Sequence, residues 1–303
     1  MDKTYNIKSI LNTICLILLV FALTSCGIKG RAYVKESDGS VGSSIAGANI
    51  TFTTGGGNYT SHATTDSNGN YKRNLKWSSF GITASHLAYQ SFDSAPTTYS
   101  VPWLGYRTVN IPLERYDGTV IVVVRHAEKA PGSGNVNLLE DPDSAGIGLG
   151  RADKLATIAG SSGIAAAYAT KWCRTAQTAQ PSVQLFNFTM HIMDSTSAAA
   201  GLDNCVPPIN ASYQLLPPQV SSSQDLAQHI LTNYTGQVVL VVGHSDSVPA
   251  IVQALSNTTN CPIPNAGSQC VIPENEYHHM FVVYVPNSGA PSISHQSYGY
   301  VPQ

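Results

Sequence analysis

Two runs of apolar, mostly β-branched residues, each followed closely by a histidine, constrain this chain more than any other feature. Residues 121–124 read Ile-Val-Val-Val and lead into Arg125 and His126, and a second run, residues 237–242, ends just before His244. A continuous apolar run predicts a strand buried on both faces, as in a parallel sheet covered by helices. Ligands bind at the carboxyl edge of such sheets. We therefore expect His126 and His244 to meet at that edge.

The first 25 residues predict an export leader. Lys3 and Lys8 precede an apolar run, residues 10–23, that is shorter than the roughly 20 residues needed to span a bilayer. The ending Leu-Thr-Ser-Cys resembles the lipobox of bacterial lipoproteins, which implies cleavage before Cys26, a lipid on its sulfur and a membrane anchor. Gly27 at the next position favours the outer membrane if the cell has two membranes. The alternative is an ordinary signal peptide with an incidental cysteine.

The composition bears on partners and compartment. Charged residues make up 11% of the chain and the formal net charge is -2, whereas typical domains hold roughly 25% charged residues. The chain contains no basic run, so we expect no nucleic-acid partner. The low charge agrees with an exported protein. We find no Cys/His spacing typical of a zinc site in the sequence, so we expect no metal and no cofactor.

Four cysteines follow Cys26, and an even number outside the cytosol indicates disulfides, with three possible pairings. The segment 261–270 is a loop containing Pro and Gly that can close on itself. We therefore expect a Cys261–Cys270 bond, which leaves Cys173 to pair with Cys205. Four free buried thiols are the alternative.

Residues 29–115 have short alternating runs separated by Gly, Asn and Asp clusters, which predicts a β-sandwich. The series Gly30-Arg31-Ala32-Tyr33-Val34, residues 45–50, residues 64–71 and Val109-Asn110-Ile111-Pro112-Leu113 resembles the carboxypeptidase regulatory-like domain, a transthyretin-like sandwich. That family commonly serves as an accessory or spacer module. His62 and His86 are isolated in this segment, so we assign them no site.

Residues 117–303 alternate strand and helix patterns, which predicts a three-layer α/β domain. The sequence predicts helices over roughly 149–158, 222–232 and 248–255, with Ser223 as a possible cap of the second. It predicts further strands over 163–168, 186–193 and 280–285.

Four fragments of this second domain occur in the order of the histidine phosphatase (phosphoglycerate mutase-like) superfamily. They are Val124-Arg125-His126-Ala127-Glu128-Lys129, the segment 148–155 with Arg151, the segment 168–179 with Arg174, and Val242-Gly243-His244-Ser245. Ala127 replaces the usual Gly of the first motif. The resemblance covers nearly the whole domain and implies a metal-independent phosphoric monoester hydrolase.

The resemblance also implies a role for each matched residue. His126 is the expected nucleophile, which forms a phosphohistidine that water then hydrolyses. Arg125 and Arg174 are expected to grip the phosphoryl oxygens through their planar donor forks, and His244 to donate a further hydrogen bond. Lys129 is expected either to replace an extra phosphate-binding Arg that some members carry or to lie solvated at the pocket rim. The expected partner is a phosphorylated small molecule or protein.

The general acid that protonates the leaving group has no clear match. No Glu lies between residues 175 and 203, and Ser245 directly follows the second histidine. We rank three candidates in the order Glu128, Asp246 and Glu276. If none of them reaches the leaving oxygen, substrates with good leaving groups, such as acyl phosphates or phosphohistidine, are favoured.

Other polar residues near these motifs receive structural interpretations. Arg151 is expected on a helix surface or in an ion pair, His278 and His279 in solvent, and Trp172 in the core or an interface. The rival to an exported, lipid-anchored phosphatase is a catalytically inactive binding or scaffold lipoprotein. Both hypotheses allow ligand binding, and only the first predicts turnover.

Overall fold

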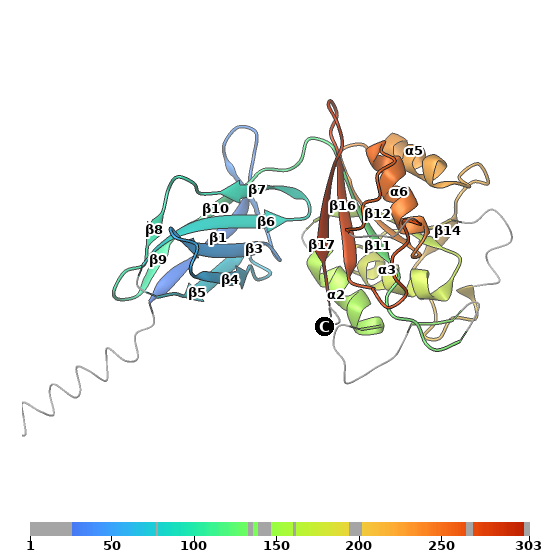
Figure 1. The fold of residues 1–303 in the computed structure, drawn as a ribbon, viewed down its shortest axis with the longest axis horizontal. Coiled ribbons are helices and arrows are strands. Elements are labelled where there is room, and N and C mark those ends of the chain that lie inside the picture. The colour runs from blue at the N-terminus through green and yellow to red at the C-terminus, as the bar shows by residue number, and fades with distance from the viewer. Residues whose placement is uncertain are drawn as a thin grey trace, which may run out of the picture. The chain divides into compact units, whose positions relative to one another are not determined.

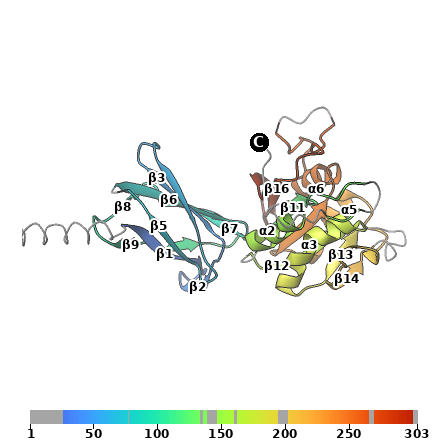
Figure 2. The ribbon, with the colours of Figure 1, turned by 90° about the horizontal axis from the view of Figure 1, so that it is seen from below.

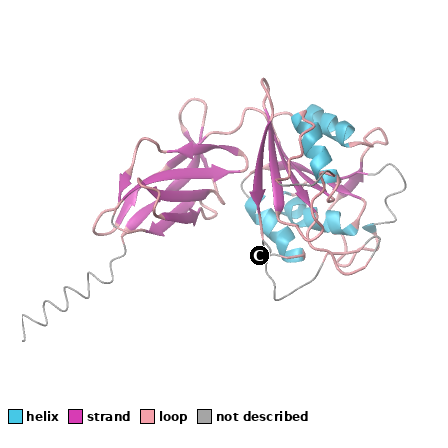
Figure 3. Cartoon of the chain, in the orientation of Figure 1, coloured by secondary structure: helices cyan, strands magenta, loops and turns pink. Residues whose placement is uncertain are grey.

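The computed structural model gives two compact units. The first comprises residues up to 86 and 90–114, and the second comprises residues 87–89 and those from 115 onward. The structure describes residues 26–76, 78–132, 136–138, 147–159, 162–193, 202–264 and 269–299. The expected leader, residues 1–25, lies outside the described residues. In Figure 3 all helices of the described residues belong to the second unit.

The described strands of the first unit form two five-stranded sheets. One sheet is organised around β1, which pairs with four other strands, and the other around the neighbouring strands β3 and β6. Alternate residues of β3 and β6 face inward, so Ile50, Phe52, Phe80 and Ile82 are fully buried between the sheets. The strands are β1 (Gly27–Lys35), β2 (Val41–Ser44), β3 (Asn49–Thr54), β4 (Thr60–Thr64), β5 (Asn70–Asn74), β6 (Ser79–His86), β7 (Tyr89–Asp93), β8 (Tyr99–Ser100), β9 (Tyr106–Thr108) and β10 (Ile111–Leu113).

The turn before β5 connects the two sheets, because β4 pairs with β3 and β5 pairs with β1. The Asp66 carboxylate accepts hydrogen bonds from the backbone N–H groups of Asn68 and Asn70. Gly69 has a φ of 75°, a conformation that glycine adopts without steric cost. The chain then places Tyr71 in the core, where its hydroxyl donates to the Val109 carbonyl at 2.6 Å.

The second unit is built on a seven-stranded mixed sheet with the order β14-β13-β12-β15-β11-β16-β17. The strands from β14 to β11 are parallel to one another, and β16 and β17 are antiparallel additions at one edge. The elements are β11 (Thr119–Arg125), α2 (Leu149–Ala159), β12 (Ile164–Thr170), α3 (Cys173–Phe186), β13 (Met190–Met193), β14 (Tyr213–Leu215), α5 (Ser223–Asn233), β15 (Val238–Gly243), α6 (Ser247–Ser256), β16 (His279–Val285) and β17 (Ser292–Ser297).

Helices pack on this sheet in two pairs, α2 with α3 and α5 with α6, as Figures 1 and 2 show. The pair α5 and α6 buries its apolar residues, such as Ile230 and Val252, in one cluster with Ile121 and Val123 of β11. Every residue of β11 and of β15 is buried, as expected for strands covered on both faces. The unit is therefore a mixed α/β fold.

Some predicted element boundaries need correction. Ser222, rather than Ser223, caps α5: its hydroxyl accepts from the Asp225 backbone N–H, and the Asp225 carboxylate accepts from the Ser222 backbone N–H, which completes a capping box. The strand predicted over 186–193 is shorter, since α3 continues to Phe186 and ends at Asn187 in a left-handed conformation. The edge strands β14 and β17 were not predicted.

The cysteines pair as the sequence predicts. Cys261 is bonded to Cys270, and Cys173 is bonded to Cys205. Cys26 is half-buried and forms no disulfide. Within the described ranges, the search for a helix that is both long and apolar enough to cross a bilayer finds none.

Candidate active site

Two adjacent parallel strands bring His126 and His244 together. In the register of β11 and β15, Arg125 lies opposite Gly243, and the His126 backbone N–H donates to the Gly243 carbonyl at 2.9 Å. Each histidine is the first residue beyond its strand. The ring centroids lie 5.4 Å apart in an edge-on arrangement. The two apolar runs of the sequence thus predict this meeting correctly.

A backbone contact decides which nitrogen of His126 is available for chemistry. The Nδ1 atom lies 2.7 Å from the carbonyl oxygen of Ala127, which can only accept a hydrogen bond. The neutral ring must therefore carry its proton on Nδ1, and the lone pair is on Nε2. Burial, and then the positive charge of Arg125, lower the pKa of His126 to about 2. The imidazole is thus a neutral base at physiological pH.

Arg125 is buried and fixed by the loop that precedes β16. Its Nη1 donates to the backbone carbonyls of Pro273, Glu274 and Glu276 at 2.8, 3.0 and 3.1 Å. The guanidinium lies 4.1 Å from the ring centroid of Tyr277, a cation–π contact. The Nε atom is buried and has no hydrogen-bond partner among the described residues. A buried donor of this kind needs an acceptor, and an anion in the adjacent cavity supplies one.

The first turn of α3 brings in the second arginine. Arg174 lies over the ring of Trp172, 4.9 Å from its centroid. One hydroxyl ties this turn to the segment that follows β11, because Thr178 Oγ1 accepts from the Ala127 backbone N–H and donates to the Arg174 carbonyl. The N-terminus of a helix favours negative charge, so the helix adds to the attraction that Arg174 exerts on an anion.

His244 is held by two threonines. Its Nε2 lies 2.9 Å from Thr170 Oγ1, which lies 2.8 Å from Thr175 Oγ1. Thr175 also lies within donor distance of the carbonyls of Thr170 and Trp172. Burial lowers the pKa of His244 to about 4, and nearby Arg174 acts in the same direction.

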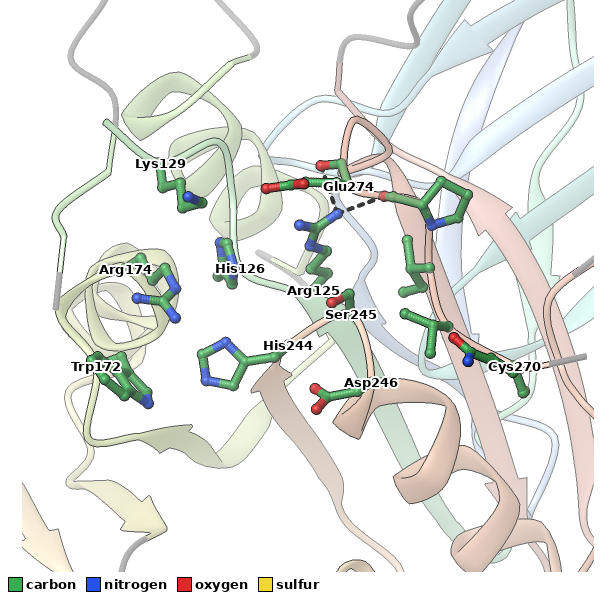
Figure 4. Close-up of a pocket in the computed structure, with 14 residues that line it drawn as sticks. Arg125, His126, Lys129, Trp172, Arg174, His244, Ser245, Asp246, Cys270 and Glu274 are labelled. Carbon is green, nitrogen blue, oxygen red and sulfur yellow. Dashed lines mark hydrogen bonds between the residues drawn. The ribbon is translucent and has the colours of Figure 1, made fainter. Parts of the chain in front are cut away.

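These residues line a cavity of about 920 Å³ (Figure 4). The cavity gathers most of the predicted site: both histidines, both arginines, Lys129 and Asp246. Its cationic side chains outnumber the carboxylates, which are those of Asp246 and Glu274. Trp172, expected in the core or an interface, forms part of the wall. The complete lining is Arg125, His126, Lys129, Trp172, Arg174, His244, Ser245, Asp246, Gln269, Cys270, Val271, Ile272, Pro273 and Glu274.

Glu128, the first-ranked acid candidate, does not line the cavity. Its carboxylate accepts from Arg151 Nη2 at 2.6 Å and Nε at 2.9 Å, and from the Gly148 backbone N–H at 2.8 Å. Arg151 is fully buried, so the alternative of an ion pair was right and that of a helix surface was wrong. Both oxygens of Glu128 are thus engaged in a structural ion pair.

Glu276, the third candidate, also lies outside the cavity lining, and its carboxylate contacts His279 Nε2 at 2.5 Å. The prediction that His279 is solvated was wrong: the side chain is buried and also contacts His295. Glu276, His278 and His279 have ligand atoms within 4.8 Å of one another. The sequence spacing did not single out this group, and whether it binds a metal stays untested. The pairing of β16 with β17, which could not be seen in the sequence, brings His295 to this cluster.

Sequence reasoning missed two residues of the site. Glu274 lines the cavity and its carboxylate has no hydrogen bond or ion pair within the described part of the chain. Tyr277 packs on Arg125 and lies 5.8 Å from the ring of His126. Both lie in an irregular segment, where no periodic signal marks which residues face a cavity.

No protein-family model and no curated protein matches this chain. Solved structures similar to it include a candidate phosphohistidine phosphatase SixA from Agrobacterium tumefaciens (14% identity, 60% of this chain, 98% of that chain, TM-score 0.34). They include phosphoserine phosphatase from Entamoeba histolytica with bound 3-phosphoglyceric acid (15% identity, 60% of this chain, 98% of that chain, TM-score 0.35). They also include the minor pilin GBS52 of Streptococcus agalactiae (16% identity, 36% of this chain, 49% of that chain, TM-score 0.26). The Bacillus anthracis TIE protein is another (15% identity, 38% of this chain, 20% of that chain, TM-score 0.26). The chain thus spans half or less of the last two. With TM-scores below 0.5, these likenesses carry no weight in assigning a function.

Proposed function

We propose that the second unit is a phosphatase of the three-layer histidine-phosphatase type, which hydrolyses phosphomonoesters through a phosphohistidine on His126. The observation that carries this proposal is the Nδ1 contact of His126 with the Ala127 carbonyl. It leaves Nε2 as an unprotonated nucleophile in a cavity whose other prominent groups are Arg125 and Arg174. A phosphoryl group carries charge on three oxygens, so its transfer needs positioning and cationic stabilisation.

The residues present can perform both halves of the reaction. Nε2 of His126 forms a bond to phosphorus while the bond from phosphorus to the leaving oxygen breaks, and an acid returns a proton to that oxygen. Water then attacks phosphorus while the bond from Nε2 to phosphorus breaks, and the carboxylate that gave its proton in the first half takes one from the water. Phosphate and the neutral imidazole are released. Arg125 contributes its free Nε, and Arg174 and His244 contribute further donors from the opposite side.

Glu274 is the acid that we favour, with Asp246 as the alternative. Asp246 also lines the cavity, but its carboxylate accepts from the Ser247 backbone N–H at the start of α6. In Figure 4 the Glu274 side chain reaches over the cavity from the same loop that holds Arg125. General acids contribute roughly 10²–10⁴-fold to such reactions.

The acid assignment predicts a dependence on the leaving group. Glu274→Gln should slow the hydrolysis of alkyl phosphates by about 10²-fold and leave acyl phosphates nearly unaffected, because their leaving groups need no proton. Steady-state kcat/KM for the two substrate classes measures this, with Asp246→Asn as the matched variant. If the selective loss appears in Asp246→Asn instead, the acid is Asp246.

We further propose that the protein is exported and anchored to a membrane through lipid on Cys26. Two disulfides support export, because such bonds persist in oxidising compartments. The first unit then serves as the spacer or accessory module between the lipid and the catalytic unit. Mass spectrometry of the native N-terminus tests this: the proposal predicts a lipidated Cys26, and an unmodified or differently cleaved terminus refutes it.

The test of function is phosphate release from an aryl phosphate by protein that begins at Gly27. The wild type should turn over and His126→Ala should not, whereas the matched variant His62→Ala, in the first unit, should retain full activity. If the aryl ester is inert, acyl phosphates and phosphohistidine are assayed next. If none of these substrates is turned over but phosphate still raises the melting temperature, the result supports the inactive binding lipoprotein instead.

A further inference from the structure

Glu276, His278 and His279 form a second cluster of polar side chains, apart from His126 and His244. It combines two imidazoles with a carboxylate. The loop before β16 supplies Glu276 and His278, and His279 is the first residue of β16. Among the described residues, these three have ligand atoms within 4.8 Å of one another, which is close enough to share one ion. Two imidazoles and a carboxylate are the ligand set of many zinc sites.

We propose that Glu276, His278 and His279 bind one transition-metal ion of the zinc class, beside the phosphate cavity. A tetrahedral zinc with bonds of about 2.0–2.1 Å needs ligand atoms roughly 3.4 Å apart. Glu276 Oε2 and His279 Nε2 are already 2.5 Å apart. His278 is half-buried and stacks on His279, with the ring centroids 4.4 Å apart. Water fills the remaining position.

Two further observations favour an ion over a simple hydrogen-bonded chain. The Nδ1 atom of His278 is buried and lacks a hydrogen-bond partner in the part of the molecule that the structure describes. His279 Nδ1 lies 2.7 Å from His295 Nε2. A metal-ligating histidine usually donates its other N–H to such a partner, which fixes the orientation of the ring. Binding of the ion needs His279 Nε2 as an unprotonated ligand, with the ring proton on Nδ1 toward His295.

The cluster is joined to the phosphate cavity through backbone atoms. The Glu276 carbonyl accepts from Arg125, and the intervening residue, Tyr277, packs on the same guanidinium. An ion on the Glu276 side chain therefore fixes the loop that orients Arg125. Besides the imidazoles, the neighbouring cation that acts on His278 is Arg151, whose charge is balanced by Glu128.

The test uses the full chain, purified without a polyhistidine tag and stripped of metal by a chelator. Titration with Co²⁺ should give the visible spectrum of a tetrahedral site with one equivalent bound, and Zn²⁺ should displace it. His278→Ala and Glu276→Gln should each weaken binding by more than about 100-fold, and His295→Ala, which removes only the orienting partner, by about 10–100-fold. Glu276→Gln keeps a group that can hydrogen-bond His279, so its fold should survive.

Two matched variants separate this site from other histidines. His62→Ala, in the first unit, and His126→Ala, in the phosphate cavity, should bind Co²⁺ like the wild type. The proposal is overturned if the wild type binds less than one equivalent, or if His278→Ala and Glu276→Gln bind Co²⁺ as tightly as the wild type. It is equally overturned if His126→Ala abolishes the spectrum, because the ion then lies in the phosphate cavity. Neither readout depends on catalysis, so the result stands apart from the proposed phosphatase activity.

Discussion

The second unit contains two histidine clusters that differ in the charge around them. His126 and His244 share their surroundings with Arg125 and Arg174. His278 and His279 share theirs with the carboxylate of Glu276. An imidazole flanked by arginines stays neutral and attracts anions, whereas one flanked by a carboxylate provides a lone pair for a cation. We therefore propose phosphate as the ligand of the first cluster and a metal as the ligand of the second, because of these neighbours.

The largest change should come from weakening the cationic cluster. Arg174→Lys keeps the charge and removes the planar fork, so kcat/KM for a phosphomonoester should fall by roughly 10²–10³-fold. Co²⁺ binding at the other cluster should not change. Steady-state kinetics and a Co²⁺ titration of the same sample measure both. Equal loss in the two measurements would mean that the clusters are not independent.

Substitution of Glu128 tests whether this carboxylate, two residues after His126, stabilises the fold or acts as the general acid. Glu128→Gln leaves the buried Arg151 without its counter-charge and should lower the unfolding free energy of the second unit by about 3 kcal/mol. Denaturant unfolding measures the loss. The folded variant should keep the leaving-group dependence of the wild type. A variant of normal stability that loses alkyl phosphates selectively would restore Glu128 as the acid.

The pH dependence of the unfolding free energy reports how strongly burial lowers the pKa values of His126 and His244. Burial lowers the pKa of His126 to about 2 and of His244 to about 4, below the ordinary value near 6.5. Between these values the unfolded chain binds protons that the folded chain does not, so the unfolding free energy falls as the pH falls below 6.5. The slope approaches about 1.4 kcal/mol per pH unit for each histidine.

Comparison of the wild type with His244→Asn isolates one of these contributions. The variant should lose less stability between pH 6.5 and 4, as measured by denaturant unfolding of the second unit at a series of pH values. Parallel curves for the two proteins would show that folding does not lower the pKa of His244, contrary to this account.

The smallest effect should be the linkage between the two clusters. Zn²⁺ should tighten phosphate binding a few-fold, because the metal fixes the loop that orients Arg125. By reciprocity phosphate should tighten Zn²⁺ binding by the same factor. Calorimetric titration of each ligand in the presence of the other measures both factors. A coupling factor of one for both ligands would show that the metal does not act through this loop.

The sequence predicted the positions of those site residues that directly follow a buried strand. The apolar runs before His126 and His244 predict two strands, and the adjacency of those strands sets the distance between the rings. The disulfides were predictable because a short loop of Pro and Gly favours closure, which leaves one other pair. Arg174 could be placed by its motif at the start of a helix.

The loop of residues 273–279 could not be predicted in the same way. Irregular backbone has no period, so nothing in the sequence tells whether Glu274 or Glu276 faces the cavity. The second cluster depends on tertiary pairing, since His295 reaches His279 only through the β16–β17 ladder. Glu128 was ranked first because it is close to His126 in sequence, and the buried charge of Arg151 decides its position instead.

The most direct test of the central claim is to trap the phosphorylated enzyme. Protein is mixed with an aryl phosphate, quenched in alkali, which preserves phosphohistidine, and digested for mass spectrometry. The account predicts one phosphoryl group on the peptide that contains His126, and none in His126→Ala. Turnover without a phosphorylated His126, or a phosphoryl group on His244 instead, would contradict it.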